Sequence, residues 1–106
     1  MVFTVNNQQW ILKFVNPNSK ELMRSDGSIT LGMTDNNVKS VFINNRLNDY
    51  MTDKVLAHEL CHIFSFSFDF IMPIEVEEIA ADFFSLYGRD MVYLLDDLIM
   101  LLKRVA

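Results

Sequence analysis

The chain has 106 residues, of which 9 are basic and 14 acidic, so its formal net charge is −5. So acidic a chain lacks the electrostatic footprint of a nucleic-acid-binding domain. Half of the residues are hydrophobic (51%) and only three are glycine, which predicts a packed core and excludes a disordered or loop-dominated chain. A single domain spanning residues 1–106 fits this length.

The first half of the chain is predicted to form short strands and turns. Residues 9–15 are rich in β-forming side chains and end at an Asn-Pro turn signal. Residues 20–24 predict one helical turn. The runs 29–34 and 39–44 follow, and the Asp-Asn-Asn turn between them predicts a β-hairpin.

The second half is predicted to form three helices. The first can be capped by Asn48 or Asp49 and runs to about residue 64. A second is expected from 74 to 87, between a proline and a glycine, and a third from 90 to about 104. The predicted fold class is therefore α+β, with a small antiparallel sheet or hairpin followed by three helices.

Two apolar features of these helices are expected to serve the core. The third helix has an apolar side that could mediate dimerisation, but in so small a domain we expect it to cover the core, and the protein to be a monomer or a weak dimer. Alternating aromatic residues follow the first helix, and we expect them in the core rather than lining an apolar substrate pocket: Phe64, Phe66, Phe68 and Phe70.

The cysteine content and the absence of targeting signals predict a cytoplasmic protein. Cys61 is the only cysteine, so no intrachain disulfide can form, which is typical of a reducing compartment. Residues 1–10 do not resemble a signal peptide. Charged residues interrupt the apolar segment 91–106, so a membrane span is not expected either. We therefore expect neither a membrane nor a nucleic acid as partner.

The strongest chemical signal is His58-Glu59-Leu60-Cys61-His62, an H-E-x-x-H motif within the first predicted helix. Residues four apart share a helix face, so both imidazoles can reach one metal ion. Glu59 lies about 100° further round the helix and can act as general base towards water at the metal. The bland alternative is an amphipathic helix with one buried histidine and one at its rim. That alternative is disfavoured, since roughly one chain in a thousand with two histidines would show this pattern by chance.

Catalytic zinc sites use three protein ligands, and this chain has no third histidine. Glu78 and Asp82 are four residues apart on the second predicted helix. Glu78 is the predicted third ligand, and Asp82 is expected to accept the free ring N–H of His58. Glu75 and Glu77 are expected outside the ligand shell. The alternative is a solvated acidic face at a helix N-terminus, which the helix dipole would favour.

At this point the residues resemble a known family. His58-Glu59-x-x-His62 with Glu78-x-x-Ala81-Asp82 is similar to the gluzincins, the thermolysin-like clan with a glutamate as third ligand. Residues 32–35, 40–44 and 56–62 are most similar to the ImmA/IrrE-type metallopeptidases and to small phage or prophage proteins related to them. The resemblance covers about residues 29 to 87 and implies a minimal zincin fold.

The resemblance implies zinc-dependent hydrolysis of peptide bonds, with Zn²⁺ as cofactor. Characterised relatives act on repressor proteins, so a peptide or protein substrate, such as a repressor or a host protein, is expected. The alternative is a catalytically weak or inactive, zinc-stabilised protein that binds a partner.

Two further expectations concern catalysis. The chain lacks the histidine that holds the transition-state oxyanion in thermolysin, so Tyr50, Tyr87, Tyr93 or a backbone group would have to serve. The strand around residues 41–44 is expected to be an exposed sheet edge beside the metal, on which an extended peptide could pair.

Cys61 lies within the motif but off its metal-facing side, so it is expected to be a small packed residue rather than a ligand or redox sensor.

Overall fold

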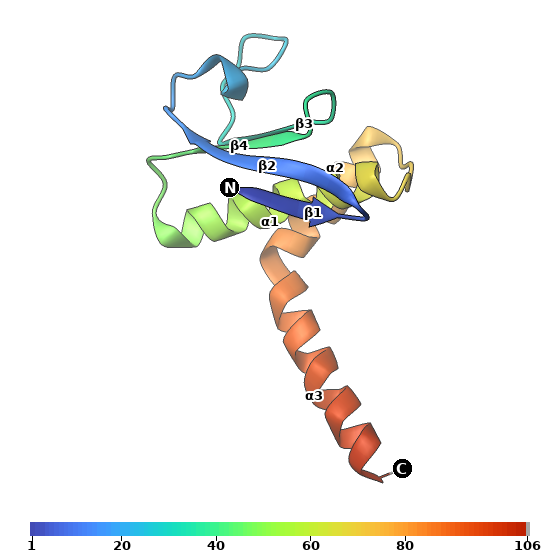
Figure 1. Cartoon of the computed structure of the whole chain (residues 1–106). Helices are drawn as coiled ribbons and strands as arrows, with labels where there is room; N and C mark the ends of the chain where they lie inside the picture. The colour runs from blue at the N-terminus through green and yellow to red at the C-terminus, as the bar shows by residue number, and fades with distance from the viewer. Residues whose placement is uncertain (106) are drawn as a thin grey trace.

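The computed structural model describes residues 1–105, whose N-terminal part forms a four-stranded sheet (Figure 1). The strands are β1 (Val2–Val5), β2 (Gln8–Val15), β3 (Gly32–Asp35) and β4 (Ser40–Asn44), and they lie in the order β1-β2-β4-β3. A short 3₁₀ helix, η1 (Lys20–Leu22), lies in the long connection between β2 and β3. The fold class is α+β, as the sequence predicts.

The sheet is mixed rather than purely antiparallel. β2 and β4 run parallel, with Leu12 opposite Val41, while the two outer pairs are antiparallel. The predicted hairpin is confirmed as β3 and β4. β1 was not predicted. Its signal is the pair Asn6-Asn7, whose positive φ angles of 49° and 62° form the tight turn into β2.

β4 lies inside the sheet and β3 is the edge strand. The expectation that residues 41–44 form an exposed edge is therefore wrong. All five residues of β4 are buried, because β2 and β3 flank the strand while a helix and the η1 segment pack against it. Leu22, which is fully buried, belongs to the η1 segment.

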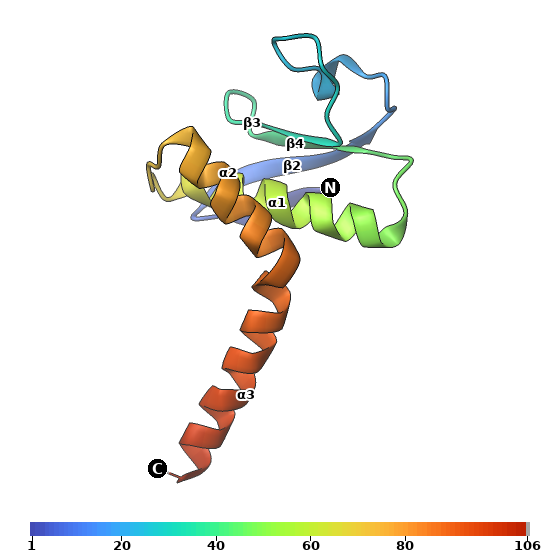
Figure 2. The same ribbon diagram turned by 180° about the vertical axis from the view of Figure 1, so that it is seen from behind.

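The core lies between the sheet and helix α1 (Asp49–Ser67), which crosses one face of the sheet (Figure 2). Trp10, Val41 and Ile43 from the sheet and Ile63 from α1 are fully buried there. The side chain of Asn48 caps the helix, accepting a hydrogen bond from the backbone N–H of Met51 at 2.8 Å. This confirms one of the two predicted caps.

α1 is longer than predicted, ending at Ser67 rather than near Phe64. The indole N–H of Trp10 donates to Ser67 Oγ at 3.1 Å and ties this end to β2. The prediction that the phenylalanines from 64 to 70 pack in the core is wrong, since they are 37% to 67% exposed. An alternating pattern that falls largely on a helix spreads its side chains around the axis instead of onto one face.

The second and third predicted helices form one continuous rod. Helix α2 (Ile74–Phe83) passes through a π-helical turn, η2 (Phe84–Gly88), directly into α3 (Arg89–Val105). Two helical rods therefore follow the sheet instead of three separate helices. Gly88 does not end the helix because it lacks the positive φ angle of a glycine cap. A Cβ at Gly88 would lie 2.3 Å from Cδ2 of Phe84, so the glycine makes room for that ring.

α3 projects from the body of the molecule like a stalk (Figures 1 and 2), which extends the longest dimension to 55 Å. The expectation that its apolar side covers the core is wrong. The helix packs against the π turn at its base, and every residue from Arg89 to Arg104 is exposed. Within residues 1–105, no helix has both the length and the apolar character needed to cross a lipid bilayer.

Candidate metal centre

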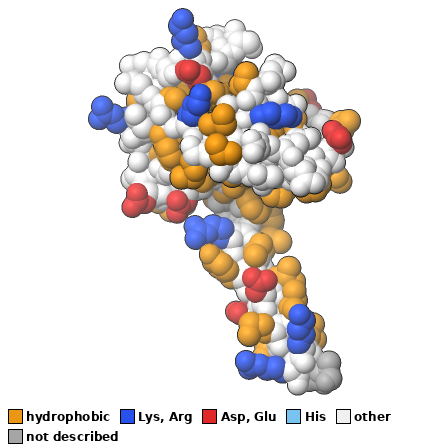
Figure 3. Space-filling model, viewed as in Figure 1, with side chains coloured by type: hydrophobic (Ala, Val, Ile, Leu, Met, Phe, Trp, Pro, Cys, Tyr) orange, Lys and Arg blue, Asp and Glu red, His pale blue; other side chains and the backbone are white. Residues whose placement is uncertain are grey.

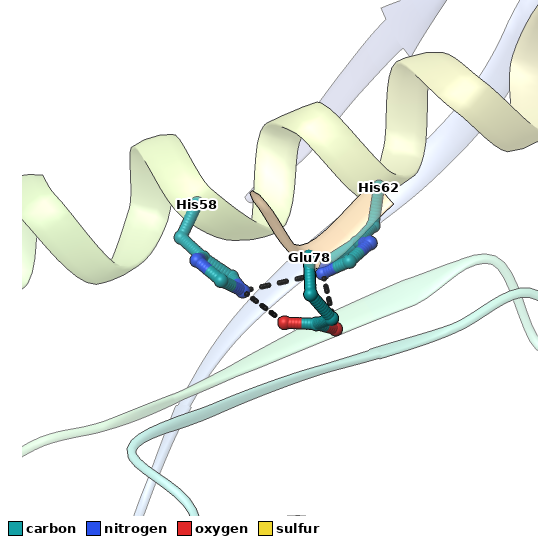
Figure 4. Close-up of side chains that lie close together, drawn as sticks. All are labelled: His58, His62 and Glu78. Carbon is teal, nitrogen blue, oxygen red and sulfur yellow. Dashed lines mark hydrogen bonds and ion pairs between the residues drawn. The ribbon is translucent and has the colours of Figure 1, made fainter. Parts of the chain in front are cut away.

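His58 and His62 lie one turn apart on α1 and point towards Glu78 of α2 (Figure 4). The two Nε2 atoms are 3.2 Å apart. One carboxylate oxygen of Glu78 lies 3.2 Å from Nε2 of His58, and the other lies 3.1 Å from Nε2 of His62. The three residues that the sequence predicts as ligands therefore form a compact triangle. Ala81, fully buried on α2, lets the two helices approach closely enough for this contact.

The size of this triangle suits zinc. Ligand atoms at ~2.0–2.1 Å from a tetrahedral ion are about 3.3–3.4 Å apart. The two Nε2 atoms are 3.2 Å apart, close to that edge length, and each lies 3.1 to 3.2 Å from a different oxygen of the Glu78 carboxylate. Two imidazoles and a carboxylate are also ligands that zinc accepts.

A carboxylate holds the other ring nitrogen of each histidine. Nδ1 of His58 lies 3.0 Å from Oδ1 of Asp82, which is the contact expected from the sequence. Nδ1 of His62 lies 2.9 Å from Oε2 of Glu77, and both of these residues are buried. A carboxylate beside Nδ1 favours the tautomer that carries its proton there, which leaves the lone pair of each Nε2 free for a cation.

The contact made by Glu77 was missed from the sequence. Glu77 was expected outside the ligand shell, and it is, but it is buried against His62 rather than solvated. The sequence did contain a signal for this contact. Each of the two ligand histidines has one ring nitrogen that does not face the metal, and the expectation named an acceptor, Asp82, for that of His58 alone. Glu75, by contrast, is exposed, as expected for a residue outside the site.

Glu59 lies beside the triangle rather than in it. Its Oε2 is 4.0 Å from Nε2 of His58, while its Oε1 accepts a hydrogen bond of 3.0 Å from the hydroxyl of Thr34 on β3. The residue is only 7% exposed, and this burial raises the pKa of the carboxyl group against the opposing effects of His62 and Thr34. A buried carboxylate with a raised pKa is a stronger proton acceptor than one in water.

Gly32, at the start of β3, sets the distance between the edge strand and the motif helix. A Cβ at this position would lie 2.6 Å from Cγ1 of Val55 and 3.1 Å from Cγ of Glu59. The strand can therefore approach α1 this closely only without a side chain at Gly32. This close approach brings Thr34 within reach of Glu59.

The group formed by His58, His62 and Glu78, named here the candidate metal triangle, opens into a cleft of about 920 Å³ between β3, α1 and α2. Its walls include the triangle, Glu59, the edge-strand residues from Gly32 to Thr34, and two cations, Arg24 and Lys54. Among the residues that the structure describes, neither cation has an acidic partner within 4.0 Å.

The structure brings none of the three candidate tyrosines into the described lining of this cleft. Tyr50 and Tyr93 line a separate, smaller hollow near Arg89, and Tyr87 packs against Phe83. All three are more than half exposed. The cationic residues that line the cleft are Arg24 and Lys54, to which no sequence motif pointed.

Cys61 lies within the motif but outside the metal triangle, as expected from the helical phase. It is partly buried, and burial raises the pKa of its thiol above the ordinary value. A thiol that is harder to ionise is less reactive, so its position favours a packing role.

Comparison with known proteins adds no relative: no protein-family model, no curated protein and no solved structure matches this chain.

Proposed function

We propose that the protein is a zinc-dependent metallopeptidase of the gluzincin type. The observation that carries the proposal is the arrangement around His58 and His62. Their Nε2 atoms are 3.2 Å apart and each faces one oxygen of the Glu78 carboxylate, while Glu59 lies beside these atoms without joining them. A purely structural zinc site has no use for a buried carboxylate at that place.

The residues of the chain have separable tasks. His58, His62 and Glu78 would hold the metal, while Asp82 and Glu77 fix the orientation of the two imidazoles. When bound, zinc supplies a Lewis acid that lowers the pKa of water towards ~7.

Glu59 is the proposed proton carrier. Thr34 holds its Oε1, so its Oε2 is free to face the metal side. There the carboxylate would take a proton from the attacking water and deliver it to the leaving amine. Its raised pKa supports both steps, since it makes the carboxylate more basic and keeps the proton until the amine can accept it.

The proposed substrate is an extended segment of a peptide or protein. β3 is an edge strand, and its residues Gly32 to Thr34 line the cleft, so a substrate could pair with its backbone. The resemblance to ImmA/IrrE-type enzymes suggests a repressor or a host protein as the target. The single cysteine, Cys61, favours action in the reducing cytoplasm.

The test compares the parent protein with Glu59→Gln. We expect the variant to fold and to bind one zinc per chain, as measured by metal analysis, because Glu59 is not a ligand. New peptide termini produced in a cell lysate, quantified by mass spectrometry, should fall by at least the ~10²-fold attributed to general base catalysis.

Glu75→Gln is the matched control, since Glu75 is an exposed glutamate outside the site. It should cleave like the parent. If Glu59→Gln cleaves as fast as the parent, Glu59 is not the base. If no zinc-dependent cleavage appears at all, the protein is better described as a zinc-stabilised binding protein.

A further inference from the structure

α3 exposes an apolar surface that nothing in the described chain covers. Leu94, Leu98 and Leu101 are 59%, 48% and 56% exposed, and Leu95 and Leu102 are 54% and 66% exposed. Figure 3 shows hydrophobic side chains along the stalk, far from the body of the molecule. Monomeric proteins rarely expose so much contiguous apolar surface, and an isolated helix of about this length is marginally stable in water. The helix therefore has the properties of an interaction element.

The apolar residues repeat in the pattern of a coiled coil. Leu94, Leu98 and Leu101 follow spacings of four and three, which is the a/d seam of a heptad. Leu95 and Leu102 lie next to the seam, one heptad apart, and widen it on one side. On the other side, the flanking positions are charged: Asp97 and, seven residues later, Arg104.

Beyond Arg89 at its base, the charges along α3 are divided between its two halves. The acidic residues Asp90, Asp96 and Asp97 lie in the first half, whereas Lys103 and Arg104 lie in the last turn. In a parallel pair of such helices, like charges lie at the same level and the helix dipoles oppose association. An antiparallel pair places the acidic part of one helix opposite the basic end of the other.

We propose that α3 pairs with α3 of a second copy of this chain as an antiparallel helical dimer. Leu98 would pack against Leu101 of the partner subunit at the centre of the seam. In that register Asp97 lies opposite Arg104 of the partner subunit, and the same pair occurs twice by two-fold symmetry. If one helix were shifted by seven residues towards the body of the partner subunit, the two Asp97 side chains would face each other and repel. The charges therefore favour the register in which Asp97 faces Arg104 of the partner subunit.

A membrane surface fits this helix less well. The basic residues of α3 are confined to its last turn and its base, and the chain as a whole has a net charge of −5, so anionic lipids would repel it. Pairing through α3 is opposed less, because the helix itself carries three acidic and three basic residues and its opposite charges can meet those of a second copy.

The test is a charge-swap cycle followed by sedimentation equilibrium over a range of protein concentrations. Asp97→Arg and Arg104→Asp each replace two attractive pairs by two repulsive pairs. Each should raise the dimer dissociation constant about tenfold. The double variant Asp97→Arg/Arg104→Asp restores both pairs in reverse and should return the constant to within about threefold of the parent.

Circular dichroism and zinc content check that each variant keeps the fold, since α3 lies outside the body of the molecule. Loss of the dimer in Leu98→Asp with an unchanged body would support the proposal. A parent protein that stays monomeric up to about 0.5 mM would overturn it. Equal dissociation constants for the parent and both single variants would overturn the antiparallel register. A monomeric parent that sediments with phosphatidylcholine vesicles would replace the proposal with a membrane-surface role.

Discussion

The four ring nitrogens of His58 and His62 divide into two kinds. Both Nδ1 atoms face carboxylates, Asp82 for one ring and Glu77 for the other, at 3.0 and 2.9 Å. Both Nε2 atoms face each other at 3.2 Å. With the protons drawn to the Nδ1 side, two lone pairs meet beside the Glu78 carboxylate, and a cation between them would stabilise this arrangement. Asp82 is exposed and Glu77 is buried, so the environment of the two carboxylates differs.

Glu77→Gln is therefore expected to weaken zinc binding more than its distance from the ion suggests. The amide cannot supply the negative charge that holds the His62 proton on Nδ1, and acceptors of this kind contribute 10- to 100-fold to metal affinity. Zinc affinity measured by competition with a chelating dye should fall by about that factor. The zinc affinity of Glu78→Gln should fall further, because this substitution removes a ligand.

Glu75→Gln serves as the control of equal chemistry, because Glu75 is exposed on the same helix. It should bind zinc like the parent. The ligand assignment would be contradicted if Glu78→Gln kept its zinc while Glu75→Gln or Glu77→Gln lost it.

At the scale of residues, the sequence was most informative where chemistry and helical period act together. The two histidines and Glu78 form the expected triangle, and Asp82 meets the expected ring nitrogen. These contacts follow from i, i+4 spacing within two helices. The helical period does not reveal which parts of the rest of the chain a helix packs against. Glu77 and the cleft cations Arg24 and Lys54 were missed for that reason.

Among the elements, the contact between β3 and α1 matters most for the site. Gly32 lets the strand lie against Val55 and Glu59, and Thr34 from the same strand donates to the Glu59 carboxylate. One element thus forms a wall of the cleft and orients the proposed base. The separation between these elements is fixed by the missing side chain at Gly32.

Gly32→Ala is expected to reduce peptide hydrolysis about tenfold or more while leaving zinc bound. The new methyl group would lie 2.6 Å from Cγ1 of Val55 and 3.1 Å from Cγ of Glu59, so the strand or these side chains must shift. The hydrogen bond from Thr34 then lengthens, and misplacing a catalytic group by about 1 Å can cost up to 10²-fold in rate. Overpacking should also lower stability by about 1–3 kcal/mol.

The measurements are kcat/KM, zinc content and the urea midpoint. Thr34→Val, which removes the hydroxyl but keeps a branched side chain, isolates the hydrogen bond from the steric effect. A Gly32→Ala protein with unchanged activity would show that β3 does not position Glu59.

Local signals predicted some elements well and others not at all. The β3–β4 hairpin and the start of α2 at Ile74 were predicted because turn and proline signals lie at their ends. The parallel pairing of β2 with β4 was not, because it depends on how the connection from 16 to 31 returns to the sheet. Gly88 was interpreted as a helix end because glycine often has that role, but here it admits the ring of Phe84.

Seen as a whole, the molecule is a compact body with a projecting helix, and the metal triangle lies where the two halves of the body meet. His58 and His62 belong to α1, which packs on the sheet, whereas Glu78 belongs to the rod that continues into the stalk. The described apolar core lies between the sheet and α1, and several apolar residues of α2, such as Ile79 and Phe83, are exposed. Bound zinc would therefore fasten α2 to the body more firmly than its apolar contacts do.

Zinc is accordingly expected to raise the thermal stability of the whole chain. An ion that binds only the folded state stabilises it by about 2.7 kcal/mol when its free concentration is 100 times the dissociation constant. For a domain of this size that corresponds to a rise in Tm of roughly 10–20 °C. Differential scanning calorimetry with buffered free zinc, at one fixed protein concentration so that pairing through α3 stays constant, measures the shift. Glu78→Gln should lose most of it and Glu75→Gln should keep it. An equal shift in Glu78→Gln would place the stabilising ion elsewhere, and no shift in the parent would mean that His58, His62 and Glu78 do not hold zinc.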